Sequence, residues 1–275
     1  MSGYSIHLCQ CDANQTRVKR TEPHTLTNAG HIEYAGNHSY SIMGLVVGSE
    51  LNGELINKGS ISAERNDEYF FASALAVSLQ GGIGSTGILR NEGSIAAVAD
   101  ASHGFFGGAV GVDVSGMEGE FINDSTGHIS AFAEGSRANA FGLYVGAASG
   151  TFTNAGTITA EALGDNFSTT ARAVYIESFS GVFDNFGVLS ATAGNGEGYS
   201  FSVNGYAGTL NNHAGGVLNG KLSVYGPEMV VENAGLINLP ETGGEEWGDQ
   251  SVVFGSYLQT ATGKLVIGAY GTGQD

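Results

Sequence analysis

The stretch "GTFTNAGTITAEA", residues 150–162, carries the pattern that decides the fold, and it places a polar residue where an apolar one is expected. Phe152, Asn154, Ile158 and Ala160 share one parity. Successive side chains of a strand point to opposite faces, so an asparagine in line with apolar residues would face the core. The fold must therefore make use of a buried amide, or Asn154 is misplaced.

The same phrase recurs along the chain in the form G-x-Φ-x-N-x-G-x-Φ-x-A-x-A, where Φ is a large apolar residue. The asparagines shared by its copies are Asn28, Asn57, Asn91, Asn123, Asn154, Asn185, Asn212 and Asn233. Their successive separations are 29, 34, 32, 31, 31, 27 and 21 residues. A repeat of this length is the signature of a stacked repeat architecture.

A second phrase, a small residue followed by Φ-x-Φ, lies between the copies. It begins at Gly44, Ala74, Ala109, Gly142, Ala173 and Ser200. Each repeat therefore offers three short strands, which is one fewer than a propeller blade needs. We predict an all-β fold, a right-handed single-stranded parallel β-helix (β-solenoid) of about eight coils of roughly 30 residues. We divide the chain into an irregular N-terminal segment or cap (1–23), the repeats (24–240) and closing coils (241–275).

A β-helix explains why the asparagine faces inward. An inward amide can hydrogen-bond to the amide of the coil above or below, so the eight asparagines are predicted to form a structural ladder. The glycine of N-x-G is expected to supply a positive φ at the bend. Extra residues follow Asn123 and Asn212, so the ladder should be least regular there.

Composition excludes several classes of function. The chain has a net charge of -17 and only ten Lys and Arg, which disfavours nucleic acid and anionic membranes as partners. No apolar stretch approaches the roughly 20 residues of a membrane-spanning helix, and the N-terminus has no signal-peptide pattern. Cys9 and Cys11, with His7, would supply only half a metal site.

One column of the repeat carries charge. Lys58, Glu92 and Asp124 each follow a ladder asparagine directly, and Arg90 lies two residues before Glu92. Stacking would bring Glu92 and Asp124 close enough to share a cation or a ligand. The other reading is a solvated turn, which we favour. We predict no catalytic, cofactor-binding or metal residue and no cofactor.

A β-helix polysaccharide lyase or glycosidase would need carboxylates gathered on one face. The exposed middle position of the third strand, aligned by the second phrase, holds no charged residue: Val46, Ala76, Gly111, Tyr144, Tyr175 and Ser202. The position after the strand-two isoleucine is also uncharged: Ser62, Ala96, Ser130, Thr159 and Ser190. Neither column predicts an active site.

Three further patterns are weak. His31 and His128 are equivalent, but Ser60 and Ser94 lie between them, so a histidine metal ladder is not expected. The acidic loop of residues 241–249 lacks the ligand spacing of known calcium loops. Its polar and aromatic side chains are Glu241, Glu245, Glu246, Trp247 and Asp249. An ice-binding array would use Ser60, Ser62, Ser94, Thr157 and Thr159, but His31, Glu33, His128 and Val188 interrupt it.

Repeated "NxGxI" phrases on Gly- and Ala-rich coils resemble the passenger domains of Gram-negative autotransporters, the type V secretion proteins. The stretch "GSYLQTATGKLVIGAYG", residues 255–271, is similar to the Y-x-Q-T-x-x-G-x-L segment that closes such passengers. The matching positions are Tyr257, Gln259, Thr260, Gly263 and Leu265. The resemblance covers roughly residues 24–271. Family members also carry a signal peptide and a C-terminal membrane barrel, so we expect this chain to be an isolated passenger, a fragment or a truncated gene product.

The resemblance implies an extracellular stalk or adhesin at the Gram-negative cell surface that acts without catalysis. Its expected partner is a protein or glycan of a host or neighbouring cell, or another copy of itself. The strand faces and the loops 64–71 and 163–172 would be displayed to that partner. A polysaccharide-degrading β-helix is the first alternative, and an ice- or other surface-binding solenoid is the second.

Overall fold

The computed structural model describes residues 9–12, 15–18, 25–36, 41–67, 70–164, 169–194, 197–240 and 250–268, the first two segments by their backbone alone. Every regular element in these ranges is a β-strand. The acidic loop 241–249, His7 and the side chains of Cys9 and Cys11 lie outside the description. So do parts of the two predicted display loops, residues 68–69 and 165–168.

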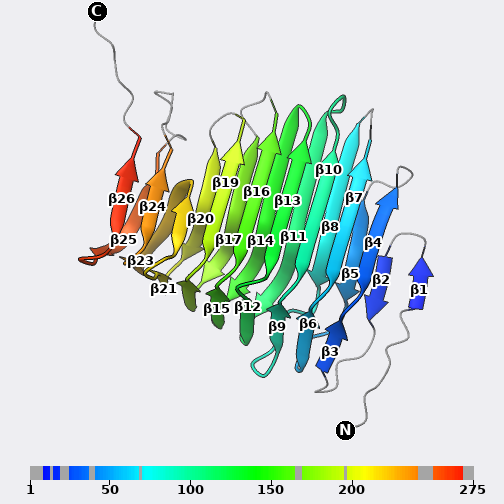
Figure 1. Ribbon diagram of the computed structural model, residues 1–275, viewed down its shortest axis with the longest axis horizontal. Helices are drawn as coiled ribbons and strands as arrows, with labels where there is room; N and C mark the ends of the chain where they lie inside the picture. The colour runs from blue at the N-terminus through cyan, green and yellow to red at the C-terminus, as the bar shows by residue number, and fades with distance from the viewer. Residues whose placement is uncertain are drawn as a thin grey trace, which may run out of the picture.

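The strands stack in three rows, one strand per coil in each row (Figure 1). The first row is β3 (Thr25–Asn28), β6 (Glu54–Asn57), β9 (Ile88–Asn91), β12 (Glu120–Asn123), β15 (Thr151–Asn154), β18 (Val182–Asn185) and β21 (Ala207–Asn212). The second row is β4 (His31–Gly36), β7 (Ser60–Asn66), β10 (Ser94–Asp100), β13 (His128–Glu134), β16 (Thr157–Leu163), β19 (Val188–Ala193), β22 (Val217–Asn219), β24 (Leu236–Leu239) and β26 (Lys264–Ile267). The third row is β5 (Ile42–Val47), β8 (Phe71–Leu79), β11 (Phe106–Met117), β14 (Arg137–Ala148), β17 (Thr170–Phe179) and β20 (Gly198–Gly205).

Two long strands near the C-terminus join the rows. β23 (Lys221–Asn233) pairs with β20 of the third row and with β21 of the first row, and β25 (Val252–Gln259) pairs with β23 along both parts. The strand pairs of the three rows are parallel, and most are in register from end to end; the pairing of β17 with β20 shifts between Ile176 and Phe179. The predicted fold class is confirmed as an all-β parallel solenoid, here of about seven turns with repeats of roughly 31 residues.

A hairpin lies at the N-terminal end of the stack. β1 (Cys9–Asp12) pairs antiparallel with β2 (Gln15–Val18), and β2 pairs in parallel with β5. The hairpin therefore continues the third row by one strand and then reverses direction. An antiparallel turn of this kind ends the parallel stack instead of extending it.

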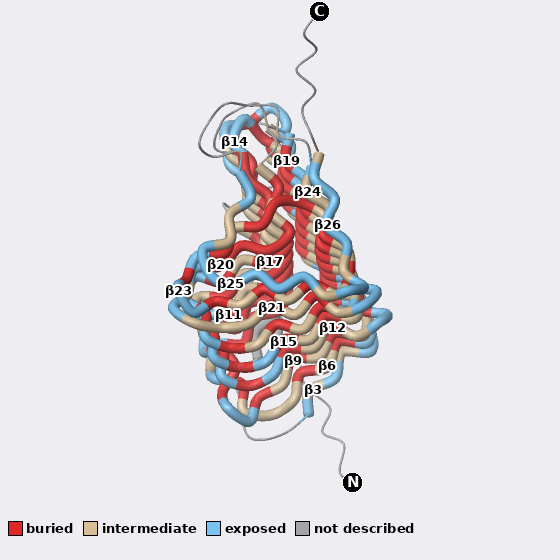
Figure 2. The backbone as a smooth tube through the Cα atoms, turned by 90° about the vertical axis from the view of Figure 1, so that its left-hand side faces the viewer, coloured by how far each residue is buried: buried red, intermediate tan, exposed pale blue. Residues whose placement is uncertain are grey.

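The core runs along the inside of the coils, where Figure 2 shows the buried positions in red. From the second coil on, the large apolar residue two positions before the ladder asparagine is buried, as Leu89, Phe121 and Phe152 illustrate, and Phe152 stacks on Phe183 with ring centroids 5.4 Å apart. The second-row isoleucines Ile61, Ile95, Ile129 and Ile158 are buried in the same way, whereas Leu265 and Ile267 of the last strand, β26, are exposed. Apolar side chains thus contact their equivalents in the next coil through the middle of the stack, and their burial supplies the main stabilisation.

The third row contains a bend that the sequence pattern did not reveal. Two consecutive residues face inward in each of its middle coils, for example Gly142 and Leu143 in β14. A Cβ on Gly142 would lie 2.6 Å from Cγ2 of Ile158 on the facing wall and 2.7 Å from the backbone oxygen of Ala173. The small residue lets the two walls meet, and the strand changes parity there.

This bend makes the predicted alignment of the third strands wrong in two coils. Ala76 pairs with Gly111 and lies at the bend, while the column that contains Val46 continues through Ser78 and Asp113 to Tyr144. The second phrase was placed two residues too early, at Ala74 and Ala109 instead of Ala76 and Gly111. Every second residue before the bend is small and faces inward, so each of them fits the start of the phrase. The column predicted to carry no charge therefore contains a carboxylate, Asp113.

Candidate functional site

The eight predicted ladder asparagines form one continuous chain of side-chain hydrogen bonds. The Nδ2 of each donates to the Oδ1 of the next at 2.7–2.9 Å, from Asn28 to Asn233. Asn57, Asn123 and Asn154 are buried, so the amides satisfy one another in place of water. The chain of bonds continues one coil further than the sequence indicated, because Asn233 donates to the Oε1 of Gln259 at 3.1 Å.

The expected irregularity after Asn123 and Asn212 is wrong. The bond from Asn123 to Asn154 and the bond from Asn185 to Asn212 are both 2.8 Å long. The extra residues form a tight turn outside the stack, where the Gly127 amide donates to the Asp124 carbonyl at 2.7 Å. Register inside the coil is therefore unaffected.

The expected positive φ at the N-x-G glycine is also wrong. The glycines with positive φ in the described ranges are Gly82, Gly135, Gly208, Gly215 and Gly220, none of which is an N-x-G glycine. Close packing between coils explains the N-x-G glycines instead. A Cβ on Gly59 would lie 1.8 Å from the Gly30 oxygen, and one on Gly187 would lie 2.0 Å from the Gly156 oxygen. Any side chain at these positions would push neighbouring coils apart.

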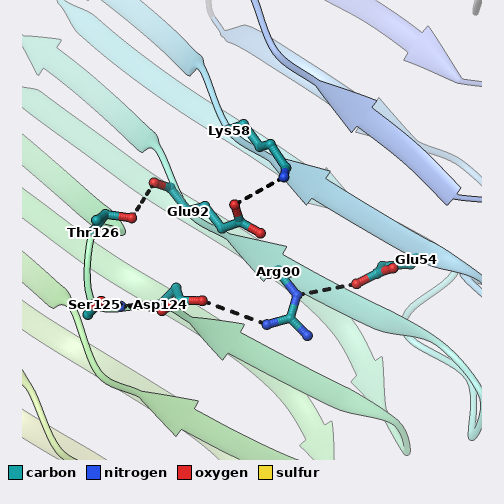
Figure 3. A network of polar contacts seen from close by, with 7 residues as sticks. All are labelled: Glu54, Lys58, Arg90, Glu92, Asp124, Ser125 and Thr126. Atoms are coloured by element: carbon teal, nitrogen blue, oxygen red, sulfur yellow. Dashed lines mark hydrogen bonds and ion pairs between the residues drawn. The ribbon is translucent and has the colours of Figure 1, made fainter.

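The charged turn column forms a network of ion pairs that crosses three coils (Figure 3). The Lys58 Nζ lies 3.4 Å from the Glu92 Oε2. The Arg90 guanidinium lies 3.3 Å from a Glu54 oxygen and 3.8 Å from an Asp124 oxygen. Glu92 and Asp124 thus each have their own cation, and the structure does not bring them together around a shared ligand. Partly exposed pairs of this kind contribute little to stability.

The second row places its outward columns in the predicted register. His31, Ser60, Ser94 and His128 follow one another on successive strands, so the two histidines are separated by two coils. The Nε2 of His31 lies 2.8 Å from a carboxylate oxygen of Glu33. No group of three or more His, Cys, Asp or Glu side chains in the described ranges is placed to hold a metal ion.

The outward side of the third row carries the most distinctive cluster, which the sequence analysis missed. We call it the aromatic face and define it as Phe141, Tyr144, Arg172, Tyr175 and Tyr199 on β14, β17 and β20. The Tyr144 ring centroid lies 5.5 Å from that of Tyr175 and 5.7 Å from that of Phe141. The Arg172 guanidinium lies over the rings of Tyr175, Phe141 and Tyr199, at 4.8, 5.6 and 5.6 Å from their centroids. Such contacts stabilise a cation on a half-buried surface.

Two acidic groups border the aromatic face. Asp113 pairs in register with Tyr144 and accepts a hydrogen bond from the Ser78 hydroxyl at 3.3 Å. Burial raises the pKa of the Asp113 carboxyl above its ordinary value of 3.8, and the Ser78 hydrogen bond partly opposes this. The Tyr144 hydroxyl donates a hydrogen bond to Glu177. This hydrogen bond is the largest cause of the raised pKa of Tyr144, and burial is the second.

A shallow groove of about 310 Å³ lies where the third row turns into the first. Its polar lining comes from Glu50, Glu118, Ser149, Ser178 and Ser180. The Glu50 carboxylate accepts a hydrogen bond from the Asn52 side chain at 3.1 Å. The charged groups of its lining are the two carboxylates of Glu50 and Glu118.

Comparison with known proteins places the fold in one family. The sequence pattern of the family described as "BigA third pectate lyase-like domain" matches residues 9–261. Neither the curated proteins nor the solved structures contain a match to this chain. Within the described ranges, no helix has the length and apolar character needed to cross a membrane.

Proposed function

Because the chain belongs to the BigA third pectate lyase-like domain family, we propose that it is a non-catalytic, passenger-type adhesive domain at a bacterial surface. In this proposal the chain is an extracellular β-helical domain. In the proposal it acts as a rigid rod, which holds its outer faces toward a partner on another cell. The resemblance to autotransporter passengers supports this context.

The observation that carries the proposal is the separation of the interior from the outer faces. The amide ladder and the apolar core run through every coil and need no ligand to be complete. The outward faces can therefore vary without disturbing the stack, as expected for a display scaffold. Glu92 and Asp124, the carboxylates that stacking was expected to bring together, instead pair with Lys58 and Arg90, which speaks against a cleavage site at the turn column.

The proposal is tested by measuring adhesion and turnover on the same purified chain. We expect saturable binding to bacterial or host cells, and no release of sugar products from a panel of plant and bacterial polysaccharides. Product release that is lost in Asp113→Asn, or in a Glu92→Gln and Asp124→Asn double variant, would establish the enzymatic alternative instead. A chain that binds no cells and no copies of itself would also contradict the proposal.

A further inference from the structure

The third row carries two arginines that contact aromatic rings and have no carboxylate partner among the described residues. Arg172 lies over three rings of the aromatic face, and Arg137 lies 5.0 Å from the Phe105 ring centroid. Neither has an ion pair within the described ranges, and the Arg172 Nε is buried without an acceptor there. Arg65 and Arg90, by contrast, pair with carboxylates at 2.5 and 3.3 Å.

This difference matters because acidic groups are abundant. The chain has 27 Asp and Glu against ten Lys and Arg, so a carboxylate partner is easy to supply. A guanidinium carries five N–H donors, and stacking on rings satisfies none of them by hydrogen bonding. Arg172 is thus held in place by aromatic contacts, and apart from the buried Nε its donors have no carboxylate partner among the described residues.

The rings beside Arg172 repeat at the spacing of the coils. Tyr144 and Tyr175 pair in register on neighbouring strands, and the Phe141 ring lies 5.8 Å from that of Tyr175. These separations are comparable to the length of one hexose unit. The C–H face of a pyranose ring is apolar and carries a slight positive charge, so it packs well on an aromatic π-face. An oligosaccharide along the coil axis would meet Tyr144 on β14 and Tyr175 on β17, whereas Tyr199 on β20 pairs in register with Arg172 and lies beside this column.

The charges around the rings select the kind of sugar. Asp113 and the exposed Glu177 border the aromatic face on one side, and Arg172 offers donors on the other. A sugar hydroxyl can donate a hydrogen bond to a carboxylate and accept one from a guanidinium, so a neutral sugar can bind to both groups. An anionic sugar would be repelled by the Asp113 and Glu177 carboxylates and by the field of a chain with net charge -17.

We propose that the aromatic face is a binding site for a neutral, hexose-based oligosaccharide that lies along the coil axis across β14, β17 and β20. This inference rests on the proposed adhesive function and assigns it a ligand class and a place. Tyr144 and Tyr175 supply the stacking surfaces, and Arg172, which pairs in register with Tyr199, supplies the donors.

The test is calorimetric titration of the chain with neutral hexaoses (cello-, laminari- and chito-oligosaccharides) and with oligogalacturonate of the same length. We expect at least one neutral hexaose to bind, and Tyr175→Ala to weaken that binding by about tenfold. Arg172→Lys keeps the charge but loses the planar donors, so it should also weaken binding. Phe186→Ala is the matched control, because Phe186 is 48% exposed and stacks on His213 at the turn between the first two rows.

Several results would overturn the inference. They are an absence of binding to every neutral hexaose, tighter binding of oligogalacturonate, and equal binding by the Tyr175→Ala and Phe186→Ala variants. If a variant unfolds, protection of Tyr175 from iodination by the bound hexaose gives the same answer on the unaltered chain. A chain that adheres to cells but binds no hexaose refutes the ligand site alone. A chain that binds hexaoses but no cells refutes the adhesive function alone.

Discussion

At the scale of single residues, the asparagine ladder shows how a polar side chain becomes part of the core. Asn154 accepts from Asn123 and donates to Asn185, both at 2.8 Å, and it is fully buried. Inside a dry stack a missing partner is costly, because the groups left behind cannot bond to water. The ladder therefore specifies the register of neighbouring coils as well as satisfying its own polar atoms.

Replacing Asn154 with leucine should lower the free energy of unfolding by about 2–4 kcal/mol, because one donor and one acceptor stay buried without partners. Thr153→Leu is the matched control, since Thr153 is the outward neighbour on the same strand and is only half-buried. It should change stability by less than about 0.5 kcal/mol. Denaturant unfolding followed by circular dichroism measures both, and equal stability of the two variants would contradict the ladder's role.

At the scale of one strand, the bend in the third row determines which residues share a face. Asp113 shares a column with Tyr144 and Tyr175 only because two consecutive inward residues shift the parity before it. Its half-buried position raises the pKa of its carboxyl, so the folded state binds a proton more readily than the unfolded state. The charge of Asp113 therefore destabilises the fold as pH rises through and above the ordinary value of 3.8.

Asp113→Asn should accordingly raise the unfolding midpoint at pH 7, with the gain disappearing as pH falls below about 4. The amide is neutral at every pH and its oxygen can still accept from Ser78. Asp184→Asn should instead lower the unfolding midpoint, because the Asp184 carboxylate accepts from Asn211 at 2.9 Å and lies 2.7 Å from the His213 Nε2. Thermal unfolding across pH 3–8 distinguishes the two, and a gain for Asp113→Asn that is independent of pH would contradict the assigned cause.

The sequence predicted the first two strands of each coil well and the third poorly, and the reason is physical. In the first two rows one parity runs through the strand, and an N-x-G turn marks its register. In the third row the inward residues before the bend are all small, so Ala72, Ala74 and Ala76 are indistinguishable as starting points. The position of the bend is determined by contact with the facing wall of the coil, and a local sequence pattern does not reveal that contact. From the sequence, Tyr144 and Tyr175 were placed in one outward column, but Phe141 and Arg172 lie before the bend and were not seen to join these rings.

At the scale of the whole molecule, each coil contacts only the coils next to it. Asn154 and Asn185 are 31 residues apart, and Thr151 pairs with Val182 at the same separation. Such stacks gain stability nearly additively from coils and their interfaces. Coils should therefore be removable as units, provided that the cut preserves the register of every row.

Deleting residues 151–181 joins Gly150 to Val182 and removes one full coil. The register is preserved, since Phe121 pairs with Phe152 and Phe152 with Phe183, so β18 would stack directly on β12. We expect cooperative unfolding with a denaturant slope lower by about a tenth, in proportion to the surface lost. Deleting Thr153 alone should be far more damaging, because it turns Asn154 outward and breaks the ladder. If the single deletion is tolerated better than the loss of 31 residues, then the stability of the rod does not come from coil-on-coil register.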